Sequence, residues 1–247
     1  FDDRTEARVK LVAGEDEQEI LTVNHLGNIF VIDKPYLAVN KGEGSATIKV
    51  QSKKGLVWSV EPCDWITATK GSETESGDFI ITDVTLAWNE NSDASRYAEL
   101  ELQVEGVSGS DGKLALWQFG SEYNYDENGL LLLPAENVAP LELRAPQNTI
   151  KQVIVPNWVS ASEPTENGDG TISYMFSFND NPSDAQFIRP SQISLEMVAT
   201  GAETILLPEI RQEYYSIGGL LTGAGFQRFA EVWAEGGDIS SWCIDGV

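Results

Sequence analysis

The sequence is poor in histidine, cysteine and basic residues, and each shortage removes a class of function. Its 247 residues include one histidine, His25, so a Ser–His–Asp triad or a histidine-ligated zinc site would have to use that side chain. The two cysteines, Cys63 and Cys243, lie 243 − 63 = 180 residues apart and match no metal-binding spacing. We therefore expect no catalytic residues, no metal and no cofactor.

Basic residues are also scarce, with 16 Lys and Arg against 39 Asp and Glu, a formal net charge of −23. An acidic surface repels nucleic-acid phosphates and anionic lipid headgroups, so nucleic acid is not an expected partner. No apolar run approaches the length of a membrane-spanning helix, and we expect no direct membrane insertion. The acidic start FDDRTEARVK, which has no Met, is compatible with a position after a removed export signal.

Most of the chain consists of short runs in which apolar and polar residues alternate. This period of two is typical of strands with one buried face. The clearest runs are SATIKVQ (45–51), LVWSV (56–60), FIITDVTLAW (79–88), AELELQV (98–104) and KLALWQF (113–119). Clusters of Gly, Ser, Asn and Lys separate them, which favours an antiparallel β-sandwich over a fold of alternating strands and helices.

The pattern also repeats along the chain. Three pairs recur at nearly one spacing: Trp65 and Trp158 (158 − 65 = 93), Arg96 and Arg189 (189 − 96 = 93), Gln118 and Gln212 (212 − 118 = 94). A spacing kept this closely indicates one architecture used twice. The polar, acidic segment SEYNYDENG (121–129) between the two units is predicted to be a linker, as in a chain of beads on a string.

The residues YLAVNKGEGSATIKVQSKKGLVWSVEPCDWITATKGSETESGD, followed by SRYAELELQV and KLALWQFG, resemble the BACON domain, an Ig-like sandwich of Bacteroidetes surface proteins. A second stretch containing NWVSASEPTENGDGTISYMF resembles another copy, in which Ile154 or a neighbour replaces Trp58. The resemblance implies a non-catalytic module, often attached to glycan-processing enzymes or surface proteins, that binds carbohydrate or acts as a spacer.

We therefore predict an all-β chain of two tandem Ig-like antiparallel β-sandwiches with a β N-terminal extension and a short C-terminal helix. The boundaries are 1–34 for the extension, 35–122 and 123–215 for the two BACON-like sandwiches, and 216–247 for the helical segment. The run LTVNHLGNIFVID (21–33) predicts a hairpin around LGN. The extension either adds edge strands to the first sandwich or forms a small β unit.

The helix is predicted from Thr222, a possible N-cap, and four apolar residues at helical spacing. These are Phe226, Phe229, Ala230 and Trp233. An isolated helix of this length is unstable, so it docks on the second sandwich or caps a further domain that starts within 216–247.

The tryptophans divide into core and surface candidates. Trp58 shares a face with the apolar residues of its run and is predicted to point into the sandwich. Trp65 and Trp158, each preceded by a proline, are predicted to fill the two interiors; the alternative is a ring exposed as a platform for sugars.

Trp117 has the opposite phase from Leu114 and Leu116 and is predicted to point outward from the core of its own sandwich. An exposed ring there would suit ligand binding; the alternative is that the neighbouring domain or residues 1–34 cover it. Tyr123 and Tyr125 in the linker either face solvent, where they would also suit ligand binding, or pack the two domains together. The loops ENGDG (166–170) and NDNPSD (179–184) are acidic but lack calcium-loop spacing, and we read them as turns.

The main functional hypothesis is a non-catalytic protein, exported to the cell surface or periplasm of a Bacteroidetes bacterium, with an outer-membrane lipoprotein anchor as one form. Its expected partner is a cell-surface glycan or glycoprotein, and its role adhesion, carbohydrate binding or spacing. An alternative is an accessory front-end module of a larger glycan-degrading enzyme. A third hypothesis, a glycosidase, would need two carboxylates converging in a cleft, and the sequence singles out no such pair among its 39 acids.

Overall fold

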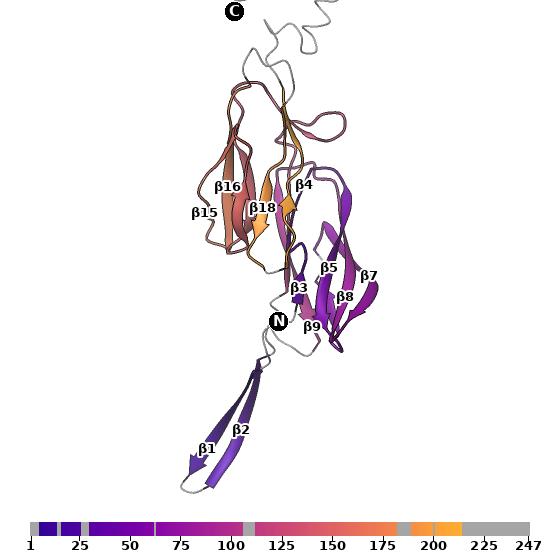
Figure 1. The fold of residues 1–247 in the computed structure, drawn as a ribbon, viewed down its shortest axis with the longest axis vertical. Coiled ribbons are helices and arrows are strands. Elements are labelled where there is room, and N and C mark those ends of the chain that lie inside the picture. Colours follow the sequence, from indigo (N-terminus) through magenta and orange to yellow (C-terminus); the bar gives the residue numbers. More distant parts are fainter. Residues whose placement is uncertain are drawn as a thin grey trace, which may run out of the picture.

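The computed structural model describes residues 5–13, 16–25, 30–61, 63–105, 112–181, 189–199 and 201–213. These residues form strands, turns and loops and contain no helix, so the predicted all-β class is confirmed for them. The predicted helix of segment 216–247 lies outside the described residues. Two β-sandwiches lie side by side, and a separate hairpin extends from the N-terminal end (Figure 1).

The first sandwich, residues 30–118, has two four-stranded sheets, ordered β3-β5-β8-β7 and β4-β10-β9-β6. Its strands are β3 (Phe30–Ile32), β4 (Tyr36–Val39), β5 (Gly44–Lys53), β6 (Trp58–Val60), β7 (Ile66–Ser76), β8 (Phe79–Trp88), β9 (Arg96–Val104) and β10 (Lys113–Gln118). Alternate residues of both sheets meet in the core, including Ile48, Val84 and Leu102, all fully buried. The period of two in the sequence produces this inward face.

The second sandwich, residues 131–212, repeats the plan with shorter strands. They are β11 (Leu131–Leu133), β12 (Leu141–Pro146), β13 (Ile150–Ile154), β14 (Val159–Ala161), β15 (Thr165–Glu166), β16 (Thr171–Phe178), β17 (Arg189–Ser191), β18 (Ser194–Met197), β19 (Ile205–Leu206) and β20 (Ile210–Gln212). One layer is the sheet β12-β16-β14, with β15 also paired to β16. The other is formed by two short sheets, β11-β20-β17 and β13-β18-β19.

The glutamine at the end of each unit has the same role in both sandwiches. Gln118 is fully buried, and its Nε2 donates to backbone oxygens that include those of Lys41 at 3.0 Å and Asn89 at 3.0 Å. Gln212 is also fully buried, and its Nε2 donates to the oxygens of Ala135 at 3.2 Å and Asn179 at 3.0 Å. The spacing of 94 residues in the sequence therefore corresponds to a repeated arrangement of the Nε2 donors, whereas Gln118 Oε1 accepts from Arg96 and Gln212 Oε1 has no partner among the described residues.

The tryptophan after each proline is also held alike. Trp65 and Trp158 are partly buried and contact the two cores, and each backbone oxygen accepts a hydrogen bond from the strand end opposite, from Asn89 N at 3.2 Å and Asn179 N at 2.9 Å. Trp58 is only 6% exposed, as predicted. Trp58 lies opposite Val104, and Met197 is the counterpart of Val104 at the repeat spacing (197 − 104 = 93). The residue opposite Met197 is the buried Ile150, whereas Ile154 is 47% exposed. Ile150 therefore takes the place of Trp58 in the second sandwich.

The N-terminal extension contains a hairpin in a different place from the one predicted. Strand β1 (Thr5–Ala13) pairs antiparallel with β2 (Asp16–His25), with Ala13 opposite Asp16. Because β2 pairs with β1, and residues 30–32 pair with β5, the two arms of the hairpin predicted around LGN do not pair with each other, and that prediction is wrong. Strand β3, which lies before the predicted boundary at residue 35, instead pairs with β5 as an edge strand of the first sandwich. The β1–β2 hairpin extends away from both sandwiches (Figure 1).

Candidate functional site

The most unusual feature of the fold is a β-strand buried on both faces. In β10, Leu114 and Leu116 enter the core of the first sandwich, and Ala115 and Trp117 point the other way, as the period of two requires. A sandwich strand normally turns this second face to water. Here Ala115 and Trp117, 5% and 4% exposed, join one buried cluster with the core of the second sandwich.

The adjoining strand β4 contributes to the same face. Tyr36 is fully buried and Ala38 is 7% exposed, and both belong to the cluster that includes the second core. Strand β10 lies against β12, and β4 lies against β19. Because β12 and β19 are edge strands of the two layers of the second sandwich, the β4–β10 face closes the side between them. We call this contact region the junction.

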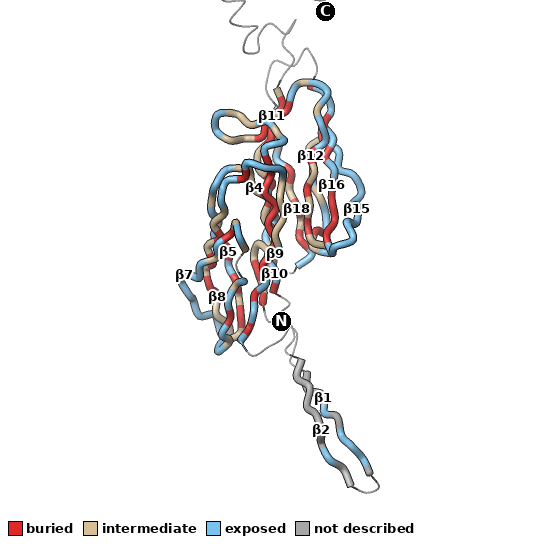
Figure 2. Tube along the Cα trace, turned by 180° about the vertical axis from the view of Figure 1, so that it is seen from behind, coloured by how far each residue is buried: buried red, intermediate tan, exposed pale blue. Residues whose placement is uncertain are grey.

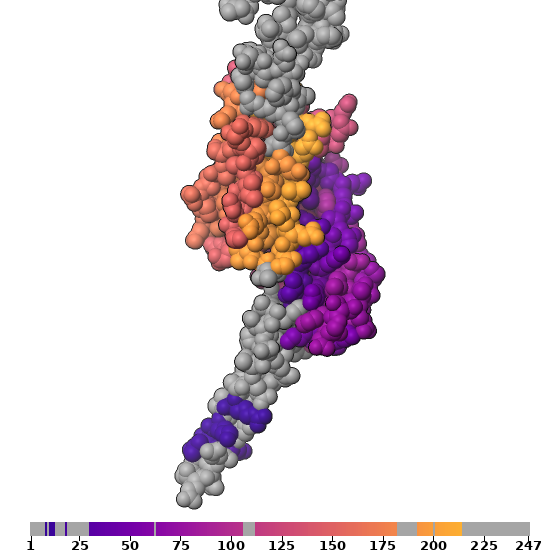
Figure 3. All heavy atoms as spheres, viewed as in Figure 1, coloured from indigo at the N-terminus to yellow at the C-terminus, as the bar shows by residue number. Residues whose placement is uncertain are grey.

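Figures 2 and 3 show the junction from two sides. In the tube view, buried residues alternate with half-buried ones along β4, β12 and β18, and β10 is buried along most of its length (Figure 2). In the space-filling view the second sandwich lies directly against the first along its length (Figure 3). The prediction of two separate units joined like beads on a string is therefore wrong, because residues of both units form one buried cluster.

Trp117 is covered, so the open stacking surface proposed for it is not present. Its ring packs edge-to-face on Phe119, with ring centroids 6.3 Å apart, and Phe119 packs in the same way on Tyr123 at 5.7 Å. The prediction that Trp117 points away from its own core is correct, and the alternative of cover by a neighbouring domain is what the structure shows. Among the described residues its buried Nε1 has no hydrogen-bond partner.

The two linker tyrosines are part of the junction's border. The hydroxyl of Tyr123 accepts a hydrogen bond from Glu142 N at 3.2 Å, and that of Tyr125 donates to Gly120 O at 2.9 Å. Burial raises the pKa of both phenols above their ordinary value. Lys41 Nζ lies 4.8 Å from the centroid of the Tyr125 ring. Both rings are partly buried, and whether they contact a ligand stays a prediction.

Segment 121–129 itself is an ordered turn. The carboxylate of Asp126 accepts hydrogen bonds from Leu130 N at 2.9 Å and Asn128 N at 2.8 Å, and these bonds lower its pKa. Gly129 O accepts a hydrogen bond from Asn40 Nδ2 at 2.9 Å, which ties the turn to the end of β4. The polar sequence that predicted a linker therefore forms a fixed connection.

Polar contacts complete the junction. The hydroxyl of Tyr36 donates to Arg144 O at 2.8 Å, and the Arg144 guanidinium lies over the Tyr97 ring, 5.5 Å from its centroid. Burial raises the pKa of Tyr36 and of Tyr97 well above their ordinary value, so both phenols stay neutral to a higher pH than an exposed tyrosine. An ion pair joins Lys34 to Glu203 at 3.3 Å. The junction thus combines an apolar centre with a polar rim, the composition of a stable interface.

A second, partly buried arrangement lies at the end of the first sandwich. The guanidinium of Arg96 stacks on the Trp65 ring, 4.2 Å from its centroid, and its Nε donates to Gln118 Oε1 at 2.9 Å. Its NH2 group donates to Asn89 O at 2.8 Å. The residues of the repeated motif in the first unit therefore bind one another, which gives Trp65 a structural role.

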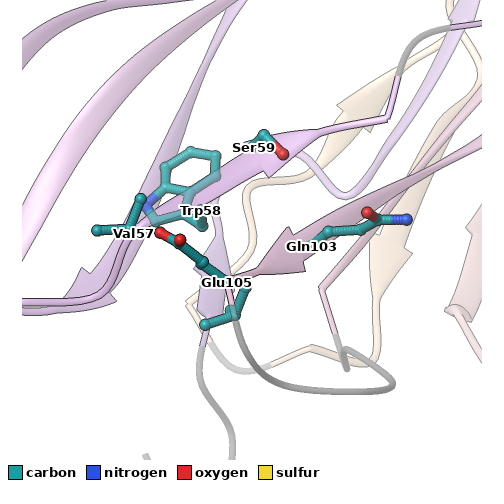
Figure 4. A pocket seen from close by; sticks show the side chains of 6 residues that line it. Val57, Trp58, Ser59, Gln103 and Glu105 are labelled. Atoms are coloured by element: carbon teal, nitrogen blue, oxygen red, sulfur yellow. The ribbon is translucent and has the colours of Figure 1, made fainter.

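The first sandwich also carries an open pocket of about 450 Å³ on β6 and β9. Its lining residues are Val57, Trp58, Ser59, Gln103, Val104 and Glu105 (Figure 4). Lys70 Nζ covers one face of the Trp58 ring at 4.0 Å from its centroid, so this indole is not a free stacking platform. The exposed groups are the apolar Val57 and the polar side chains of Ser59, Gln103 and Glu105. No motif in the sequence predicts this pocket.

The acidic loop 166–170 is used for structure. Asn167 Nδ2 donates to Ser173 Oγ at 2.9 Å, and the carboxylate of Asp169 accepts from Thr171 Oγ1 at 2.6 Å and pairs with Arg144. The hydrogen bond from Thr171 is the main cause that lowers the pKa of Asp169. Within the described ranges no three His, Cys, Asp or Glu residues gather where they could hold a metal ion.

Comparison with known proteins assigns no family. No family model and no curated protein matches the chain. A sialic-acid-binding region of a Streptococcus sanguinis adhesin has a TM-score of 0.28 and 8% identity, over 77% of this chain and 78% of the adhesin chain. A Bacteroides ovatus GH5 xyloglucanase has a TM-score of 0.29 and 15% identity, over 52% of this chain and 28% of the enzyme chain.

A third solved structure, mouse clustered PcdhgC3 EC1-3, has a TM-score of 0.28 and 11% identity, over 85% of this chain and 77% of the mouse chain. Similarity at this level assigns neither family nor ligand, and the resemblance to the BACON domain stays a prediction. No helix in the part of the chain that the structure describes is long and apolar enough to cross a membrane.

Proposed function

We propose that this chain is a rigid, non-catalytic spacer of an exported bacterial surface protein, built from two BACON-type Ig-like sandwiches. The observation that supports it is the junction, in which Tyr36 and Trp117 of the first sandwich complete the core of the second. Domains of one chain move relative to each other by default, unless the interface between them is large and apolar. An apolar interface with fixed geometry suits a part that holds neighbouring domains at a set distance and angle.

The proposed setting is the cell surface or periplasm of a Bacteroidetes bacterium, with a lipoprotein anchor attached upstream of Phe1. The net charge of −23 supports an exposed, soluble surface rather than contact with anionic lipid. Surface labelling of intact cells with a membrane-impermeant amine reagent tests this setting. Labelling that is absent from intact cells and from cells with a permeabilised outer membrane, and that appears only after lysis of the inner membrane, would contradict it.

Rigidity is tested by small-angle X-ray scattering of the chain together with distance measurements between fluorophores on the two sandwiches. Exposed Ser59 and Glu163 are suitable attachment points, after substitution to Cys with Cys63 and Cys243 replaced by Ser. We expect a single narrow distance distribution. A broad distribution at physiological salt would show that the junction opens in solution and would refute the spacer proposal.

Glycan binding is a second candidate function, favoured by the open pocket on β6 and β9. Carboxylate, amide and hydroxyl groups are the usual partners of sugar hydroxyls, and Glu105, Gln103 and Ser59 present all three there. The test is a glycan array with the wild-type chain and Gln103→Ala/Glu105→Ala. A signal lost in the variant supports binding at the pocket, and no signal from either protein contradicts it.

Binding at Trp117, Tyr123 and Tyr125 stays a separate prediction. It requires the junction to open first, because Trp117 is 4% exposed in the closed arrangement. The accessory-module alternative predicts a catalytic domain elsewhere in the same polypeptide, which the full-length coding sequence would reveal.

A further inference from the structure

In each sandwich, one sheet has its first strand along the chain paired with its last strand along the chain. In the first sandwich β4 and β10 are these strands, and in the second they are β11 and β20. Both pairs are parallel, whereas all other strand pairs in the described part of the chain are antiparallel. Antiparallel pairing is the more common and slightly more stable arrangement, so two parallel pairs at equivalent places require an explanation.

The register decides how a pulling force would act on these ladders. Tyr36 lies opposite Ala115 at one end of the β4–β10 ladder, and Val39 lies opposite Gln118 at the other. The chain enters the ladder at Tyr36 and leaves it at Gln118. Tension along the chain therefore pulls the two strands from opposite ends of the ladder and loads all its hydrogen bonds together in shear. Two antiparallel terminal strands would be pulled from one end and would open one bond at a time.

The second sandwich has the same geometry. Leu131 lies opposite Ile210 and Leu133 opposite Gln212, so the entry and exit points are again at opposite ends. A further hydrogen bond, from Glu213 N to Leu133 O at 2.9 Å, closes the far end of the ladder. Its counterpart in the first sandwich runs from Phe119 N to Val39 O at 3.0 Å. Both units therefore have the same shear arrangement, ending at the same repeated glutamine.

Burial protects the first ladder from water. The side chains of β4 and β10 pack against the first core on one face and into the junction on the other. Water that competes for the backbone groups must therefore reach them through the junction. The buried Gln118 ties the exit end of β10 to the loop after β4 through Lys41 O at 3.0 Å and Asn40 O at 3.3 Å.

From this geometry we infer a further function: the chain resists mechanical tension, with the β4–β10 and β11–β20 ladders as two force-resisting clamps in series. The inference rests on the proposed function, because a surface spacer is the setting in which tension arises. It concerns the barrier to forced unfolding, which is separate from equilibrium stability.

The test is single-molecule force spectroscopy in two matched geometries that both load only the first sandwich. In the shear variant, Lys34→Cys and Ser121→Cys place the handles at opposite ends of the ladder, and Lys113 is replaced by Ala. In the peeling variant, Lys34→Cys and Lys113→Cys place them at the same end, and Ser121 is replaced by Ala. Cys63 and Cys243 are replaced by Ser in both, and each variant is first shown to be folded by circular dichroism.

We expect the shear variant to unfold at about twice the force of the peeling variant or more, at one pulling rate, because its bonds must break together. The gain in contour length identifies the event, since 113 − 34 = 79 residues in the peeling variant extend by roughly 3.3–3.6 Å each. Equal forces in the two geometries, or a higher force on peeling, would overturn the inference. That result would leave the spacer proposal intact, whereas a broad inter-sandwich distance distribution would refute the spacer and leave the clamp result unchanged.

Discussion

Replacing Trp117 by Ala is the sharpest test of the junction, because the ring is either the centre of a shared core or a ligand contact. The side chain is 4% exposed and packs on Phe119. A buried aromatic side chain removes roughly 150–250 Å² from water, worth about 4–6 kcal/mol at about 25 cal/mol per Å². The unpartnered Nε1–H offsets about 1–3 kcal/mol of this.

The net loss for Trp117→Ala is therefore about 3 kcal/mol of unfolding free energy, within the usual range of about 3–5 kcal/mol for removing a buried Trp. Trp117→Phe is the matched control. It keeps most of the apolar area and removes the unpartnered N–H, so we expect its stability to lie within about 1 kcal/mol of the wild type.

The assay is urea unfolding followed by far-ultraviolet circular dichroism. The wild-type chain should unfold in one transition because the two sandwiches share a core, and Trp117→Ala should lower the midpoint and separate the transition into two. The reasoning is refuted if Trp117→Ala unfolds within about 1 kcal/mol of the wild type in a single transition. A glycan signal lost in that variant without a stability change would instead restore the ligand-contact hypothesis.

Three further predictions use contacts elsewhere in the two sandwiches. Gly120→Ala should lower the melting temperature, since its Cβ would clash with the backbone of residues 94–95, and Gly42→Ala, with no atom within 4 Å, should not. Gln118→Ala and Gln212→Ala should each cost about 1–3 kcal/mol in urea unfolding, with the larger cost for Gln118→Ala because, among the described residues, only Gln118 Oε1 accepts a hydrogen bond from an arginine; a larger cost for Gln212→Ala would contradict this. Burial raises the pKa of Tyr97, so folding favours its neutral form. The contribution of Tyr97 to stability should be constant below about pH 10 and should be lost as pH rises towards the higher folded pKa, and alkaline melting curves of the wild type and Tyr97→Phe should converge there.

The strands and the repeat were predictable because both depend on local sequence. Period-two alternation identified the inward faces of β5, β9 and β10, and the phase of Leu114 and Leu116 gave the direction of Trp117 correctly. The spacing of Gln118 and Gln212 indicated two equivalent units, and the hydrogen bonds of both side chains agree with it. Period, phase and spacing are all properties of one strand or one unit.

The cover over Trp117 was not predictable in the same way. Alternation tells which face a side chain takes but not what packs on it, and the covering strands β12 and β19 are distant in sequence. The polar composition of 121–129 favoured a linker between separate units, yet the carboxylate of Asp126 accepts backbone hydrogen bonds that hold the segment in a turn. The pocket on β6 and β9 also depends on strands about 45 residues apart, and no single run of sequence contains it.

The junction also limits how such a chain can be rearranged by recombination. Because the first unit supplies a wall of the second through Tyr36 and Trp117, the two copies are not interchangeable parts. A gene fusion that cuts the chain at residue 120 would uncover the side of the second sandwich between β12 and β19. It would also expose the Trp117 ring of the first sandwich to water. When this protein is duplicated or recombined with others, the two sandwiches should therefore be copied together as one unit.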